Sequence, residues 1–177
     1  PDPAARGGTR VTRVLLVDDQ ALVRTGFRVI LDAHPDLDVV GEAGDGAEGI
    51  ALAEALAPDV VCMDVQMPGL DGLEATRAIA ARPDGPAVLV LTTFDRDDYL
   101  FQALEAGASG FLLKTASPEQ LVDAVRVLAT GDALLSPAVT RRVIERFGGP
   151  AREPAVDGAI SELTEREADV FRLLADG

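Results

Sequence analysis

Five polar residues of types that can handle a phosphoryl group come at the ends of short apolar runs. Asp18 and Asp19 follow RVLLV, Asp64 ends VVCMD, Thr92 ends AVLVLT, and Lys114 follows GFLL. If the runs are strands of one parallel sheet, their carboxyl ends bring all five side chains to the same edge. An acid pair after a strand is more often a solvated turn, and a threonine there is usually structural. The prediction of a site therefore depends on the convergence of all five residues.

The chemistry expected of this set is phosphoryl transfer. Two unit charges about 4 Å apart interact by about 4 kcal/mol at an effective dielectric constant near 20, so three clustered carboxylates favour a cation. Mg²⁺ suits them, because it prefers carboxylate oxygens, water and phosphoryl oxygens. A carboxylate can then attack phosphorus and form an acyl phosphate. Lys114, the only lysine in the sequence, would neutralise one phosphoryl oxygen, and Thr92 would donate a hydrogen bond to another.

The elements that position these residues alternate along the chain. Strands are predicted at 13–17, 38–43, 60–64, 87–92 and 110–113, and helices follow at 21–31, 47–56, 72–80, 96–106 and from 118. Asp71 and Ser117 are the predicted N-caps of the third and fifth helices. The first helix is expected to direct one apolar face inward, formed by Leu22, Val23, Phe27, Ile30 and Leu31. Five strand–helix repeats predict an α/β fold with a five-stranded parallel, doubly wound (flavodoxin-like) sheet.

The pattern changes after Gly131, and it predicts a division of the chain. A further helix is expected at 136–147, a segment rich in glycine, proline and charge at 148–159, and a new helical unit from 160. We therefore predict a flexible N-terminal arm at 1–10, an α/β domain at 11–131, a linker helix and linker at 132–160, and the first helix of an all-α domain at 161–177.

Composition limits the function classes. The net charge is −14, from 30 acidic and 16 basic residues, which argues against nucleic-acid binding by most of this surface. A single cysteine, Cys62, excludes an intramolecular disulfide, and its place in an apolar run predicts a core residue. No cluster of cysteine and histidine suggests zinc. No apolar run is long enough to span a membrane, and no signal peptide is recognised, so a soluble cytoplasmic protein is expected.

The motifs resemble the receiver domain of two-component response regulators. The resemblance covers about residues 13–131 and is carried by VLLVDD at 14–19, MDVQMPGLDG at 63–72, Leu91-Thr92 and GFLLK at 110–114. It implies that Asp64 accepts a phosphoryl group from a histidine kinase. It also implies that Mg²⁺ is bound directly by Asp19, Asp64 and the backbone carbonyl of Gln66, and through water by Asp18.

Two further implications concern the response to phosphorylation. By the resemblance, Thr92 and Phe111 are the switch residues that move on phosphorylation. The sequence LTERE at 163–167, with Val170-Phe171 and Leu174-Ala175, resembles the start of a LuxR-type helix-turn-helix domain, as in the NarL/FixJ class. That class implies a transcription regulator that contacts DNA through its output domain and can form a homodimer on phosphorylation. The helix that reads DNA is expected after the last residue of this sequence.

Three other functions remain as alternatives. A Mg²⁺-dependent aspartyl phosphotransferase of the haloacid-dehalogenase kind is disfavoured, because its nucleophile follows the first strand in an Asp-x-Asp motif. A flavodoxin-like nucleotide-binding module is disfavoured because Asp18-Asp19-Gln20 would repel a phosphate. A receiver that works without phosphorylation is harder to exclude, although all five site residues are intact. Enzyme activity is expected only as Mg²⁺-dependent self-phosphorylation and autodephosphorylation.

Overall fold

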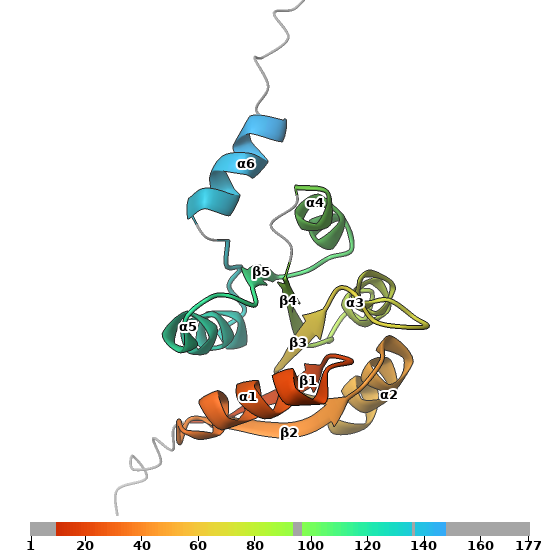
Figure 1. Cartoon of the computed structure of the whole chain (residues 1–177), viewed down its shortest axis with the longest axis vertical. Helices are drawn as coiled ribbons and strands as arrows, with labels where there is room; N and C mark the ends of the chain where they lie inside the picture. The colour runs from red at the N-terminus through yellow and green to blue at the C-terminus, as the bar shows by residue number, and fades with distance from the viewer. Residues whose placement is uncertain (1–9, 94–96, 136, 148–177) are drawn as a thin grey trace, which may run out of the picture. The chain divides into compact units, whose positions relative to one another are not determined.

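The computed structural model describes residues 10–93, 97–135 and 137–147, and its strands and helices alternate along the chain (Figure 1). The chain divides into two compact units, Pro1–Thr140 and Arg141–Gly177. The strands are β1 Thr12–Val17, β2 Leu37–Ala43, β3 Val60–Asp64, β4 Ala87–Thr92 and β5 Gly110–Leu113. The helices are α1 Ala21–Asp32, α2 Gly46–Leu56, α3 Gly72–Ala80, α4 Asp97–Glu105, α5 Pro118–Ala129 and α6 Pro137–Phe147.

The five strands form one parallel sheet in the order β2-β1-β3-β4-β5. This order confirms the predicted doubly wound, flavodoxin-like fold. The chain adds β2 on one side of β1 and then crosses to place β3 on the other side. The switch point therefore lies between β1 and β3, where ligands bind in sheets of this kind.

Helices cover both faces of the sheet. α1 and α5 contact each other and the strands on one face, whereas α2, α3 and α4 pack side by side on the opposite face (Figure 1). The central strands are buried on both faces, which explains why their sequences are continuous apolar runs rather than alternating ones. The core on the α1 and α5 side comprises Val14, Leu16, Leu31, Leu37, Val39, Val60, Cys62, Leu89, Leu91, Leu121, Val122, Ala124, Val125 and Leu128.

The two predicted N-caps are present as capping boxes. The Asp71 carboxylate accepts hydrogen bonds from the backbone N–H groups of Leu73 and Glu74 at 2.9 and 2.8 Å. The Ser117 hydroxyl accepts from the backbone N–H of Gln120, and Pro118 is the first residue of α5. Each cap satisfies a helix-end donor that would otherwise lack a partner, worth about 1 kcal/mol.

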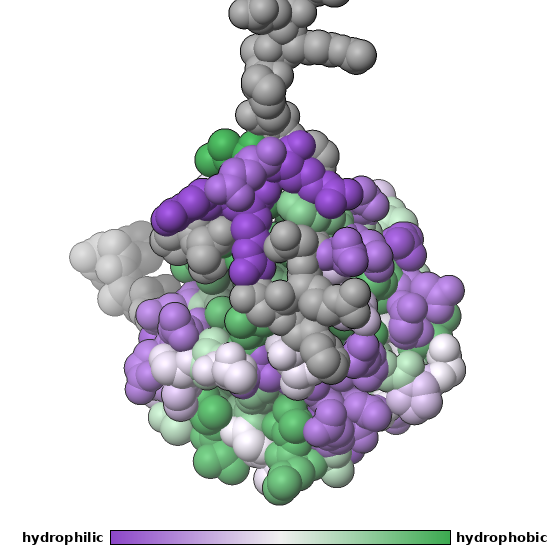
Figure 2. Space-filling view, turned by 45° about the horizontal axis from the view of Figure 1, so that its top comes forward, coloured by the Kyte–Doolittle hydropathy of each residue, from purple (hydrophilic) through white to green (hydrophobic). Residues whose placement is uncertain are grey.

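One residue of the predicted inward face of α1 is exposed. Leu22 has 85% of its surface exposed, whereas Leu31 is fully buried. Because residues seven apart lie on nearly the same face of an α-helix, Leu22 shares an outer stripe with Val29. Val29 is 67% exposed. The inclusion of Leu22 in the core was therefore wrong. Figure 2 shows hydrophobic residues at the surface, gathered at the lower edge of that view.

Several predicted segments lie outside the described residues. These are the N-terminal arm up to residue 9, the linker after residue 147, and the predicted helix at 161–177. The helix expected at 136–147 is present as α6. Among the residues that the structure describes, no helix has both the length and the apolar character needed to cross a bilayer.

Cys62 is expected to be unreactive in the native protein. Its side chain lies in the core at 2% exposure, and burial raises the pKa of the thiol to about 12. Because the thiolate is the reactive form, native protein should not react with Ellman's reagent, whereas denatured protein should release one equivalent of chromophore. Rapid reaction under native conditions would contradict this prediction.

Candidate functional site

The sheet register brings the five predicted residues to one edge. Val17 pairs with Met63 and Leu91 with Asp64, so Asp18 is level with Asp64 at the carboxyl ends of β1 and β3. Thr92 ends β4, and its backbone carbonyl accepts a hydrogen bond from the N–H of Lys114 at 2.8 Å. The placement follows from parallel pairing, because each strand delivers its C-terminal residue to the same edge.

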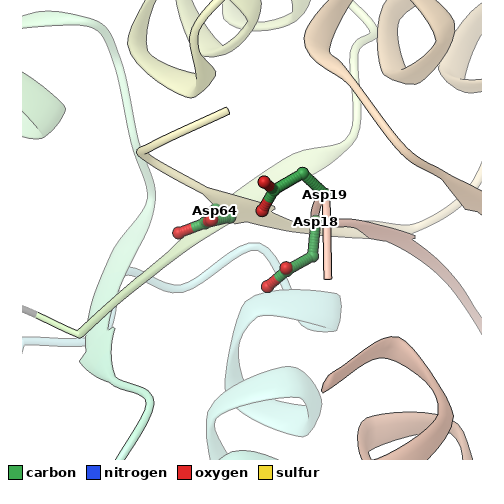
Figure 3. A group of neighbouring side chains, drawn as sticks. All are labelled: Asp18, Asp19 and Asp64. Carbon is green, nitrogen blue, oxygen red and sulfur yellow. The ribbon is translucent and has the colours of Figure 1, made fainter. Parts of the chain in front are cut away.

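Three carboxylates gather at this edge. Asp18, Asp19 and Asp64 each have a carboxylate oxygen within 4.8 Å of the others, and the side chains extend beyond the strand ends (Figure 3). Asp18 and Asp64 are buried and Asp19 is exposed. Their oxygens form a hard-donor set open to solvent on the Asp19 side. A divalent cation of the Mg²⁺ type suits such a set.

The ammonium of Lys114 is the counter-charge for this acidic cluster. Its Nζ lies 2.6 Å from Asp18 Oδ2 and 3.1 Å from Asp64 Oδ2, and the lysine side chain is only 7% exposed. Within the described part of the chain, Asp18 Oδ2 is held by this ion pair and makes no hydrogen bond. Such an oxygen keeps lone pairs that a bound water can use.

The environment of Asp64 makes its carboxyl harder to ionise than a free aspartate. Burial raises the pKa of the Asp64 carboxyl, the neighbouring charge of Asp18 raises it further, and Lys114 and the Gln66 backbone N–H act in the opposite direction. The net shift is upward. An added positive charge at the site would therefore stabilise ionised Asp64, the form that acts as a nucleophile.

Two residues without an assigned role in the sequence also shape the site. A Cβ atom at Gly72 would lie 1.7 Å from the Asp64 carbonyl oxygen, so only glycine permits the start of α3 to approach β3 this closely. The Gln66 side-chain amide donates a hydrogen bond to the Tyr99 hydroxyl at 2.8 Å and joins the loop after β3 to α4. Gly72 is the last residue of the motif at 63–72, whereas Tyr99 gave no sequence signal.

Thr92 and Phe111 lie on the same face of the sheet. Their neighbours Leu91 and Leu112 pack into the α1 and α5 core, so alternation along the strands directs Thr92 and Phe111 toward the α4 side. Both side chains are buried, Thr92 at the edge of the site and Phe111 one strand away. Both residues therefore belong to the face of the sheet that is opposite the α1 and α5 core.

The known proteins to which this chain is similar include response regulators and their domains. Residues 14–126 match the response regulator receiver domain. Over 166 residues the chain is 42% identical to the transcriptional regulatory protein LiaR of Bacillus subtilis, covering 93% of this chain and 77% of LiaR. It is 35% identical to the nitrate/nitrite response regulator NarL of Escherichia coli K12, covering 93% and 75%. A LuxR-family two-component response regulator from Aurantimonas aligns with TM-score 0.72 and 35% identity over 78% of this chain and 99% of that one.

This chain belongs to the response regulator receiver family. Its relatives place it among two-component response regulators of the NarL/LuxR type, which are phosphorylated on an aspartate and regulate a DNA-binding output. Regulators of this type interact with histidine kinases and bind DNA through the output domain. They are generally not enzymes. The resemblance inferred from the sequence motifs is thereby confirmed.

Proposed function

We propose that Asp64 is the phosphoacceptor of this response regulator. The observation that carries the proposal is its position: a buried carboxylate at the switch point of the sheet, 3.1 Å from a buried ammonium. Asp18 is equally buried, but its Oδ1 accepts the Gln20 N–H at 2.8 Å. Asp19 is exposed and has no lysine beside it. Asp64 therefore combines burial at the switch point with a counter-charge within reach.

The metal site proposed here takes oxygen ligands from two strand ends. Asp19, Asp64 and the Gln66 backbone carbonyl would hold Mg²⁺, with Asp18 acting through water. The donors are hard oxygens, and within the described residues three clustered carboxylates face the single ammonium of Lys114, so the residues fit the ion. Bound Mg²⁺ would supply positive charge between the carboxylate and the incoming phosphoryl group.

Side chains of this protein carry out the phosphoryl transfer itself. An oxygen of ionised Asp64 forms the bond to phosphorus as the bond to the donor breaks, so no proton has to be removed from the nucleophile. Lys114 is placed to leave Asp64 Oδ2 and pair with a phosphoryl oxygen. The Thr92 hydroxyl donates to another. Because Thr92 and Phe111 face α4, we assign to them the switch that alters the α4–β5 surface.

The domain division is part of the same proposal. Residues 11–131 form the receiver, 132–160 a linker helix and linker, and 161–177 the first helix of a LuxR-type helix-turn-helix domain. A histidine kinase supplies the phosphoryl group, and phosphorylation promotes a homodimer through the altered surface. DNA is contacted by the output domain of the full-length protein.

Intact mass after incubation with acetyl phosphate tests this function directly. One added phosphoryl group is expected with Mg²⁺, and none is expected when EDTA replaces it. The adduct should be lost under alkaline conditions, as expected for an acyl phosphate. Absence of an adduct, under conditions that label an established receiver, would favour a regulator that works without phosphorylation.

A further inference from the structure

We propose that Arg24 is a positioning residue for the metal site, because it fixes the peptide that joins Asp18 to Asp19. The inference rests on the proposed function, in which this acid pair serves a divalent cation. It assigns a role in that site to a residue on α1 that is not itself among the proposed ligands.

The contacts of Arg24 connect α1 to the acid pair. Its Nη1 donates a hydrogen bond to the Asp18 carbonyl oxygen at 2.6 Å, and its Nε donates to Glu42 Oε2 at 3.2 Å. The side chain is 18% exposed. Glu42, near the end of β2, also accepts a hydrogen bond from Arg28 Nε at 2.5 Å. The Arg28 and Arg24 guanidiniums lower the pKa of the Glu42 carboxyl, so this anchor stays ionised.

The Asp18 carbonyl matters because the peptide bond is planar. Fixing its oxygen fixes the plane that contains the Asp19 nitrogen, and with it the direction in which the chain leaves Asp18. The other side of Asp18 is held by its N–H, which donates to the Ala43 carbonyl at 3.1 Å. Arg24 supplies the second anchor, so the two contacts together hold the residue on both sides.

Asp19 depends on this backbone for its position. Within the described residues its side chain makes no hydrogen bond or ion pair, and it is exposed. The bond from Arg24 therefore restrains the peptide on the N-terminal side of Asp19, and the Asp18 carboxylate, which accepts from the Gln20 N–H, restrains the peptide on its C-terminal side. Supporting residues of this kind orient metal ligands, and their mutation typically costs about 10–100-fold in metal affinity or activity.

Arg28 provides a matched control on the same helix. It shares Glu42 with Arg24, but its other contacts are the Val39 carbonyl at 3.1 Å and Asp32 at 3.6 Å. It does not reach the acid pair. Substituting either arginine with glutamine removes one positive charge near the site, which by itself favours cation binding. If only Arg24→Gln weakens Mg²⁺ binding, the loss of charge cannot be the cause, because that loss should strengthen binding in both variants.

The test is a titration of isotope-labelled protein with MgCl₂, without any phosphodonor. Binding is monitored by NMR through the amide chemical shifts of residues at the site. We expect Arg24→Gln to raise the Mg²⁺ Kd about tenfold, at the lower end of the range for supporting residues. Arg28→Gln should leave the Kd at or below the wild-type value. Thermal unfolding of both variants should show that they are folded at the titration temperature.

Arg24→Lys is the second variant, and it carries the test if Arg24→Gln does not fold. A lysine keeps the charge but cannot bind Glu42 and the Asp18 carbonyl with one planar fork, so the Kd should rise by a smaller factor. Wild-type affinity in both Arg24 variants, or an equal loss in Arg28→Gln, would overturn the inference. Absence of Mg²⁺ binding in the wild type would instead overturn the proposed function, so the two failures are distinguishable.

Discussion

Replacing Asp64 with asparagine is expected to abolish phosphoryl incorporation. The amide keeps the size of the side chain but removes the anionic oxygen that attacks phosphorus. Intact mass after incubation with acetyl phosphate and Mg²⁺ should show one adduct for the wild type and none for Asp64→Asn. Because the loss is of the nucleophile itself, no residual labelling at the same site is expected at longer times.

The matched control removes one carboxylate far from the site. Asp123, on α5, is 75% exposed and lies 3.9 Å from Arg126 in a weak surface pair. Asp123→Asn makes the same change in charge, so it should be labelled at the wild-type rate. Full labelling of Asp64→Asn would place the phosphoryl group elsewhere, with Asp18 as the next candidate to substitute.

The same Asp64→Asn variant is expected to be more stable than the wild type without a divalent cation. The raised pKa of Asp64 means that the native state binds its proton more tightly than the unfolded chain does. Stability therefore falls as the pH rises from the ordinary aspartate pKa of the unfolded chain through the raised pKa of the native state. Asparagine removes this loss, so the free energy of unfolding in EDTA should rise by on the order of 1 kcal/mol. Mg²⁺ should narrow this difference by stabilising only the wild type.

Lys114→Met is expected to cause the largest loss of stability. Removing the ammonium leaves Asp18 and Asp64 buried as a like-charged pair, and breaking a buried ion pair by deleting one partner typically costs about 3–5 kcal/mol. Denaturant unfolding at neutral pH in EDTA measures the loss. The loss should shrink as the pH falls through the raised pKa of Asp64, because the protonated carboxyl no longer needs the lysine.

Arg126→Met is the control for an exposed pair. Arg126 donates to both carboxylate oxygens of Asp36 at 2.8 and 2.9 Å, but their side chains are 42% and 36% exposed. Solvent screens such a pair, so its loss should cost little stability. A cost for Lys114→Met no larger than that of Arg126→Met would show that water or another cation already neutralises the acid cluster.

The sequence by itself determined the sheet and the residues at its edge. Continuous apolar runs such as VVCMD can be buried only between two helical layers, and helix-period segments between them require parallel crossovers. Once the strands are parallel, Asp64, Thr92 and Lys114 must come to one edge, because each ends or follows its strand. The caps at Asp71 and Ser117 were equally local, since a capping side chain bonds to backbone three residues away.

Only the tertiary structure decided which of these groups touch and how they are held. The exposure of Leu22, by contrast, follows from the helical period, which groups it with Val29 and not with Val23 and Phe27. The bonds of Arg24 to Asp18 and of Gln66 to Tyr99 join segments separated along the chain, and Gly72 is required by the close approach of two backbones. Such contacts depend on distances between elements, which follow from how the helices pack on the sheet and leave no periodic signal in the sequence.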